Sequence, residues 1–104
     1  MFDVKGYVVF NGDYDSYRDV KDYLMEMFYV DPTGEKGKYN LFCRGSSSYD
    51  EQQLRKILYR YKDNIKDFLI EGFESEEEEL WKITKRDDEF ILLYGFITFK
   101  KVEW

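Results

Sequence analysis

The chain has 104 residues, a formal net charge of −6 and an aromatic content of 20%. This length fits one domain, residues 1–104, with a single core, and the aromatic content excludes wholesale disorder. The negative charge argues against a general phosphate-binding protein, because binding to a polyanion depends on basic residues.

Three further absences in the sequence indicate a cytoplasmic protein, in a microbe or in a host that it infects. No window reaches the ~20 apolar residues of a membrane span. The first residues contain Asp3 and lack the basic start of a signal peptide. Cys43 is the one cysteine, which fits a reducing compartment.

The first half of the chain predicts a strand, a helix and a second strand. Apolar residues alternate over 2–10, as in a strand, and the turn at 11–13 ends it. Apolar residues at helical spacing predict a helix over about 16–29, with Ser16 as its cap. A loop around Pro32 follows, and 39–44 alternate as the second strand.

The second half predicts a helix followed by three strands. Ser48 and Glu51 form a capping box, which starts a helix over about 49–64. Strands are expected over 68–73, around Trp81 and Ile83, and over 90–99.

The predicted order is therefore β-α-β-α-β-β-β, an α+β fold with a mostly antiparallel five-stranded sheet. Two helices, each with one apolar stripe, can cover only one face of such a sheet. Several strands nevertheless carry apolar residues on both faces. Either the last strand is central and its neighbours are bulky, or the uncovered face is an interface with a second copy or another partner.

Charge is segregated along the chain. Residues 11–35 hold seven acids and two bases, residues 36–66 hold eight bases and three acids, and residues 67–79 hold seven acids and no base. The last block contains five glutamates in six positions, 74–79. This run is either a solvated loop, an edge that blocks association of sheets, or a negative surface for a basic partner.

No residue pattern indicates catalysis, a metal or a cofactor, so we expect a non-enzymatic protein. The chain has no histidine, which removes the usual general base and the commonest metal ligand. Without one, Cys43 has no activating base. The acids from Asp13 to Asp19 have the spacing that opens a calcium loop, but the loop needs glycine where Arg18 stands. They are expected to stabilise the start of the first helix.

The predicted second helix combines bases with aromatic residues. Arg55, Lys56, Arg60 and Lys62 alternate with Tyr59 and Tyr61. This combination can bind single-stranded nucleic acid. It also suits an amphipathic helix that neutralises the acidic first helix, and the negative net charge favours this second interpretation.

Residues 6–14, 71–73 and 80–83 resemble segments of small ferredoxin-like proteins that are common in phage and plasmid genomes. In size, acidity, aromatic content and lack of catalytic residues, the chain is also similar to phage-encoded inhibitors of host defence, which include anti-CRISPR and anti-restriction proteins. Many of these act as nucleic-acid mimics. The resemblance implies a fold that is a ferredoxin-like variant and a function in inhibition.

The leading hypothesis is an acidic inhibitor that occupies the basic, nucleic-acid-binding surface of a protein partner. Its expected contact residues are Glu74, Glu76, Glu77, Glu78, Glu79, Asp15, Asp19, Asp22 and Glu26. Nucleic acid and membrane are not expected as ligands. Two alternatives stay open: an RNA- or single-strand-binding domain that uses the basic second helix, and a homodimeric accessory protein that uses the apolar sheet face.

Overall fold

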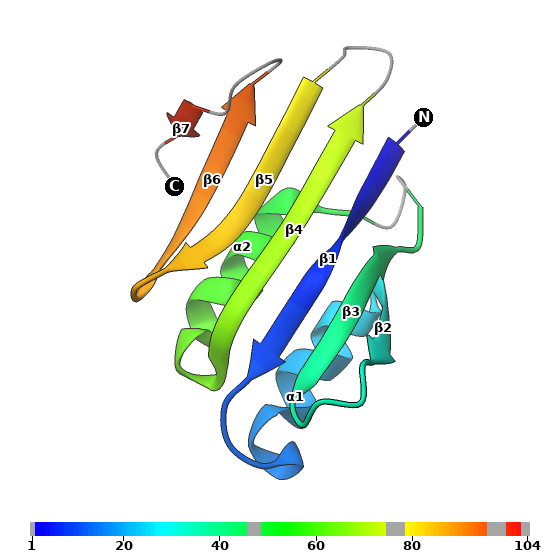
Figure 1. Ribbon diagram of the computed structural model, residues 1–104, viewed down its shortest axis with the longest axis vertical. Coiled ribbons are helices and arrows are strands. Elements are labelled where there is room, and N and C mark those ends of the chain that lie inside the picture. Colours follow the sequence, from blue (N-terminus) through cyan, green and yellow to red (C-terminus); the bar gives the residue numbers. More distant parts are fainter. Residues whose placement is uncertain (1, 46–48, 75–78, 96–99, 103–104) are drawn as a thin grey trace.

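A computed structural model describes residues 2–45, 49–74, 79–95 and 100–102 as one antiparallel sheet with two helices. Within this part of the chain the sheet has seven strands in the order β2-β3-β1-β4-β5-β6-β7 (Figure 1). The strands are β1 (Phe2–Phe10), β2 (Phe28–Pro32), β3 (Lys38–Cys43), β4 (Ile65–Glu74), β5 (Glu79–Arg86), β6 (Glu89–Gly95) and β7 (Lys100–Val102). The helices are α1 (Tyr14–Met25), α2 (Glu51–Arg60) and the short 3-10 helix η1 (Lys62–Asn64).

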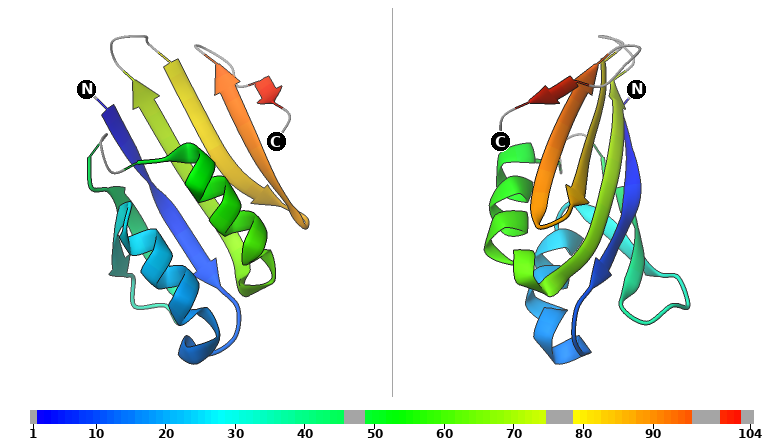
Figure 2. Two further views of the ribbon diagram at one scale, coloured as in Figure 1. Left: turned by 180° about the vertical axis from the view of Figure 1, so that it is seen from behind. Right: turned by 60° about the vertical axis from the view of Figure 1, so that its left-hand side comes forward.

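Both α-helices lie on the same face of the sheet, and the other face is uncovered (Figure 2). The core lies between the sheet and these helices. Buried residues of the strands alternate with more exposed ones, as for Val4, Val8 and Phe68. The helices contribute buried residues at helical spacing, such as Leu24 and Leu58. Burial of these side chains is the main force that holds the two layers together.

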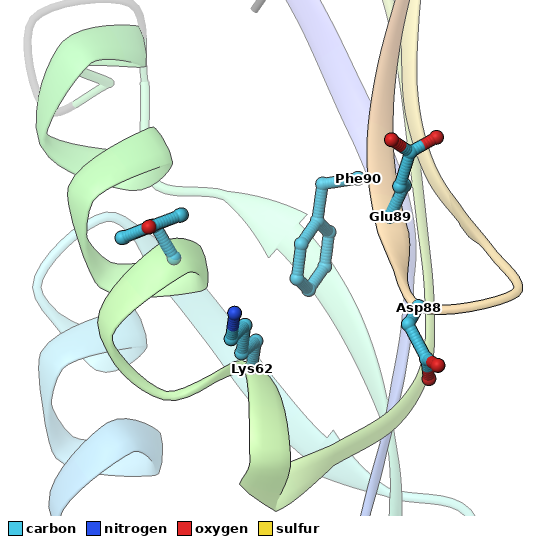
Figure 3. Close-up of a pocket in the computed structure, with 5 residues that line it drawn as sticks. Lys62, Asp88, Glu89 and Phe90 are labelled. Carbon is cyan, nitrogen blue, oxygen red and sulfur yellow. The ribbon is translucent and has the colours of Figure 1, made fainter.

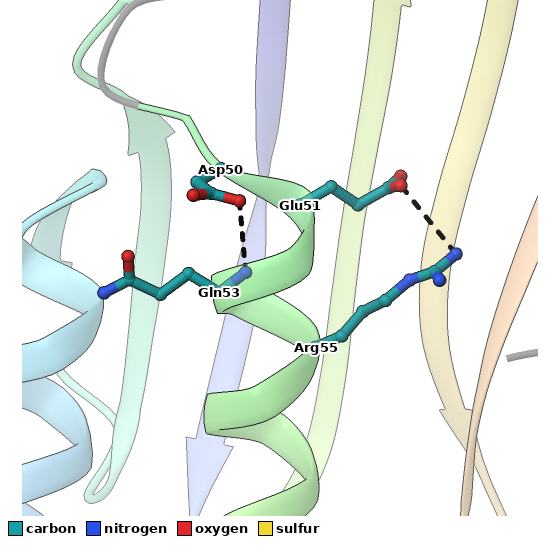
Figure 4. Close-up of polar contacts among 4 residues, drawn as sticks. All are labelled: Asp50, Glu51, Gln53 and Arg55. Carbon is teal, nitrogen blue, oxygen red and sulfur yellow. Dashed lines mark hydrogen bonds and ion pairs between the residues drawn. The ribbon is translucent and has the colours of Figure 1, made fainter.

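Aspartates cap both helices. Asp13 accepts a hydrogen bond from the backbone N–H of Ser16 at 3.0 Å, and α1 begins at Tyr14. Asp50 accepts one from the N–H of Gln53 at 3.2 Å, so α2 begins at Glu51 (Figure 4). The prediction that Ser16 caps the first helix is therefore wrong, and Asp50 caps α2, whereas the predicted cap Ser48 lies outside the described residues. Asp accepts hydrogen bonds from the free N–H groups of a first turn as well as Ser does, and Asp13 and Asp50 stand immediately before the first residues of the two helices.

The predicted α+β class, the antiparallel pairing and the placement of two helices on one face are confirmed. The predicted count of five strands is wrong, because the described part of the chain adds β2 and β7. Residues 28 and 29 were expected to end the first helix, but they begin β2. Of the last predicted strand, β6 covers the first part up to Gly95, and residues 96–99 lie outside the described residues.

The first six elements, β1-α1-β2-β3-α2-β4, follow the split β-α-β-β-α-β order. Each helix connects two parallel strands that have a third strand between them, so β3 separates β1 from β2 and β1 separates β3 from β4. The strands β5, β6 and β7 then extend the sheet as an antiparallel meander beside β4.

Two glycines permit close packing in the sheet. A Cβ atom at Gly72 would overlap the indole ring of Trp81, its directly opposite neighbour on β5. A Cβ atom at Gly6 would overlap the carbonyl oxygen of Leu69 on β4. Both positions therefore exclude larger residues as long as their neighbours keep these places.

Candidate interaction surfaces

Four carboxylates form a straight line along α1, which we call the acidic stripe: Asp15, Asp19, Asp22 and Glu26. Their spacing of i, i+4, i+7 and i+11 places them on one side of a helix. All four residues are exposed. At 1.5 Å of rise per residue, the stripe is about 16 Å long. The helical spacing therefore brings together the four members of the expected contact set that precede residue 30.

The bases of α2 do not neutralise this stripe by ion pairs in the described part of the chain. The salt bridge found there is within α2 itself, between Arg55 and Glu51 at 3.8 Å (Figure 4). Between the helices, Gln53 Nε2 donates a hydrogen bond to Glu26 Oε2 at 3.4 Å. The contact found between α2 and the stripe within the described residues is thus a hydrogen bond from an uncharged side chain at one end of the stripe. It does not support the interpretation that the basic helix neutralises the acidic one by ion pairs.

Tyr61, directly after α2, is influenced by charged residues of both helices. Its ring lies 5.9 Å from that of Tyr23 on α1. Desolvation raises the pKa of Tyr61 above its ordinary value, Arg60 opposes this, and Asp19 adds to it by its negative charge. Asp19 and Arg60 therefore both act on the same phenol without forming an ion pair.

The glutamate run is at a different place from the start of the acidic stripe. Glu74 and Glu79 are paired across β4 and β5, and Glu74 is also opposite Phe2, where β1 begins. The helix α1 follows the other end of β1, at Phe10 (Figure 1). Glu76, Glu77 and Glu78 lie outside the described residues. The described part of the expected contact set thus divides into a stripe on the helix layer and the pair Glu74 and Glu79 at one end of the sheet.

The uncovered sheet face carries aromatic and basic side chains on β1, β2 and β3. Residues directly opposite in an antiparallel pair share a face, and one such row runs from Tyr29 through Phe42 to Lys5. Tyr29 is 51% exposed and Phe42 is 46% exposed. We call the following group the open-face patch: Lys5, Tyr7, Tyr29, Lys38, Phe42 and Arg44.

Cations lie over two rings of this patch. The Arg44 guanidinium is 4.5 Å from the centre of the Tyr29 ring, and the Lys38 ammonium is 5.2 Å from that of Tyr7. The Tyr7 hydroxyl donates a hydrogen bond to Asp67 Oδ2 at 3.0 Å. Burial and this bond raise the pKa of Tyr7, in that order. The hydrogen bond therefore fixes the Tyr7 side chain toward Asp67 on β4.

A shallow depression lies at the centre of the open face. It has a volume of about 330 Å³ and is lined by Lys5, Gly6, Asn40, Phe42, Leu69 and Glu71. Pockets for small organic molecules begin at roughly this size. The wall formed by Phe42 is apolar, and Asn40 and Glu71 offer hydrogen-bonding groups.

A second cavity, of about 250 Å³, lies between the end of α2 and the turn that joins β5 to β6 (Figure 3). Tyr59, Lys62, Asp88, Glu89 and Phe90 line it. Nearby, the Lys85 ammonium donates hydrogen bonds to two backbone carbonyls, one of them that of Lys62 at 3.3 Å. Lys85 therefore ties β5 to η1 and to the start of β4.

The described residues contain no cluster of metal-binding side chains. No group of three or more His, Cys, Asp or Glu side chains among them could hold a metal ion. Cys43 Sγ donates a hydrogen bond to the Gly45 carbonyl at 3.2 Å. Each helix in this part of the chain is too short or too polar to cross a membrane.

A scan against protein-family models, a search of curated proteins and a search of solved structures each found no match to this chain.

Sequence reasoning missed Tyr29, which the helical spacing places in the first helix, and it did not connect the bases Lys5, Lys38 and Arg44 with this face. The signal that could have found Tyr29 is short: Phe28 and Val30 alternate with it ahead of Pro32. The apolar residues on both faces of the strands were recognised, and Phe42 was among them.

Proposed function

We propose that this chain is a non-enzymatic, acidic inhibitor of a nucleic-acid-binding protein, of the anti-CRISPR or anti-restriction kind. In this proposal the acidic stripe and the glutamate run occupy a basic surface on a protein partner, in the cytoplasm. The β-α-β-β-α-β order of the first six elements supports the related proposal that the fold is a ferredoxin-like variant with three added strands.

The acidic stripe is the observation that carries the proposal, because its acids beyond the first turn stand where they oppose helix stability, whereas the helix dipole favours Asp15 in the first turn. Asp15 and Asp19 are four residues apart, as are Asp22 and Glu26, and like charges at that spacing repel each other. Asp22 lies in the last turn of α1, which contains no base, and the negative end of the helix dipole disfavours an acid there. Carboxylates that lower helix stability and have no ion pair within the described residues are typical of a surface that serves binding.

The spacing of these charges supports partial mimicry of a nucleic-acid backbone. The stripe presents four carboxylates over about 16 Å, one per ~5 Å. One strand of a duplex presents a charge every ~3.4 Å. The stripe is therefore sparser than a strand of DNA, and the five glutamates at 74–79 would have to contribute to the same partner or to a second contact.

The proposal is tested by capture from a cell lysate with three immobilised proteins. They are the wild type, the triple variant Asp15→Asn, Asp19→Asn and Asp22→Asn, and a control, Asp87→Asn with Asp88→Asn, at the turn between β5 and β6. The wild type and the control should capture a protein whose nucleic-acid binding is lost in the complex, and the triple variant should capture much less of it.

Equal capture by all three proteins would remove the stripe from the proposed function. A captured protein that still binds its nucleic acid normally would refute inhibition by mimicry. The same comparison with Glu76, Glu77, Glu78 and Glu79 changed to Lys tests the glutamate run separately.

A further inference from the structure

The open-face patch combines three aromatic rings with three bases, and each ring has a base beside it. Arg44 lies over Tyr29 and Lys38 lies over Tyr7. The third base, Lys5, is directly opposite Phe42 on the neighbouring strand. Within this half of the open face, on β1, β2 and β3, Asp31 is the one acid whose side chain the structure describes. On these three strands the bases of the patch therefore outnumber the described acids on a chain of net charge −6, and Asp67 and Glu71 border the patch on β4.

We propose that this patch binds single-stranded nucleic acid. Unpaired bases stack on Phe42 and Tyr29, and the three cations contact the phosphates. Such binding needs a platform of exposed aromatic side chains on a positively charged surface. A sheet face with aromatic residues on adjacent strands is one of the forms in which proteins present this platform.

The spacing of the rings suits an extended single strand. Tyr29 and Phe42 are directly opposite on β2 and β3, so their Cβ atoms are about 5 Å apart. Phe42 and Tyr7 are diagonal neighbours on β3 and β1, at about 7 Å. Both spacings exceed the ~3.4 Å rise between the stacked bases of a duplex. Bases that stack on these rings must therefore have separated from their neighbours.

The depression beside Phe42 provides a place for one such base. The depression is shallow and open, has a volume of about 330 Å³, and has Phe42 as an apolar wall. The side chains of Asn40 and Glu71 line the same depression and can form hydrogen bonds with the edge of a base. A base in a duplex is inaccessible to these groups, so the depression favours unpaired nucleic acid.

The negative net charge of the chain does not exclude this binding, because the acidic stripe and the patch lie on different layers. The acidic stripe belongs to α1, in the helix layer, whereas the patch is on the opposite face of the sheet (Figure 2). At physiological salt, charges are screened over about 8 Å. Contacts at the patch therefore depend mainly on the charges close to it, which are the three bases and the neighbouring Asp31, Asp67 and Glu71.

A second copy of the chain is a less favourable occupant of this face. The row that contains Phe42 continues through Lys5, Glu71 and Lys82 across β1, β4 and β5. Pairing of two such faces would bury these charges, and their desolvation is costly. A single strand lying over the aromatic half leaves the rest of the row in water.

The test is fluorescence anisotropy with labelled 12-nucleotide oligouridine RNA, oligothymidine DNA and a DNA duplex, using the full chain. The Phe42→Ala variant should bind the single strands about 5- to 150-fold more weakly than the wild type does, the loss expected for one stacked base. Tyr59→Ala is the matched control, because Tyr59 is 67% exposed, has Lys62 beside its ring, and lies on α2 away from this face. A difference between the RNA and the DNA arms identifies which strand is preferred.

With three phosphate contacts, the logarithm of the binding constant should fall with that of the salt concentration with a slope of about −2. Equal binding to the duplex, or a loss in Tyr59→Ala that Phe42→Ala does not show, would overturn the proposal. It would also be overturned if light scattering showed a dimer that Phe42→Ala dissociates. Circular dichroism of each variant confirms that the fold is intact.

Discussion

Adding one methyl group at Gly72 should destabilise the whole domain. A Cβ atom there would overlap three atoms of the Trp81 indole ring. Trp81 is 6% exposed and stacks on Tyr49 with ring centres 5.2 Å apart, so the ring cannot move away freely. Overpacking of a core of this kind costs typically 1–3 kcal/mol, and we expect Gly72→Ala to lower the free energy of unfolding by about 2 kcal/mol.

The sign of this change is informative. In a strand without such a neighbour, Ala is more favourable than Gly by about 0.5–1 kcal/mol, because Gly loses more conformational entropy on folding. If Gly72→Ala lowers stability, the cause is therefore the overlap with Trp81, because the general preference of strands for Ala over Gly has the opposite sign.

Urea denaturation followed by circular dichroism measures the effect, in a double-mutant cycle with Trp81→Leu. Removing the indole removes the overlap, so Gly72→Ala should cost much less in the Trp81→Leu background. The expected coupling energy is at least about 1 kcal/mol. If Gly72→Ala costs the same in both backgrounds, the close contact between β4 and β5 is not the cause, and the reasoning fails.

Two further predictions concern α1. The hydrogen bonds from Ser16 lower the pKa of Asp13 below its ordinary value of 3.8, so the stabilisation that its charge provides is present above pH 3.8 and is lost as the pH falls through the lowered value. Acid titration of stability should therefore be less steep between pH 4 and pH 2 in Asp13→Asn than in the wild type, and identical curves would contradict this cap. Asp22→Asn should stabilise the protein by about 0.3–0.5 kcal/mol at low salt, because it removes an acid from the negative end of α1 and a repulsion with Glu26. Thermal unfolding at low salt and in 1 M NaCl checks this, since screening should abolish the gain, and a gain that survives in 1 M NaCl would have another cause.

The class of fold could be predicted from the sequence because most elements have one dominant periodicity. Residues 2–10 alternate throughout, and β1 has these bounds. The segment around Phe28 does not have a single periodicity. Met27 and Phe28 continue the helical spacing of Tyr17, Val20 and Leu24, and Phe28 also begins an alternation with Val30. Pairing with β3, which is a tertiary contact, decides in favour of the strand.

The candidate site was predictable only in its local part. The spacing of the four acids from Asp15 to Glu26 places them on one side of a helix in any fold that keeps the helix. Their position relative to Glu74 depends on the direction in which α1 returns along the sheet, and no local pattern contains that information. The same holds for the aromatic rings of β1, β2 and β3, which become neighbours only when the sheet forms.

The two proposed surfaces can be separated experimentally, because the sheet lies between them. Each has its own substitutions, on α1 for the acidic stripe and on β3 for the open-face patch, and all of them change exposed side chains. If both proposals hold, the chain can contact the basic surface of a nucleic-acid-binding protein with one layer and the single strand beside it with the other. The Asp15, Asp19 and Asp22 triple variant would then lose the protein and keep the oligonucleotide, and Phe42→Ala would do the reverse. If one substitution abolished both interactions, a single surface would be responsible, and the assignment of separate roles to the two layers would be wrong.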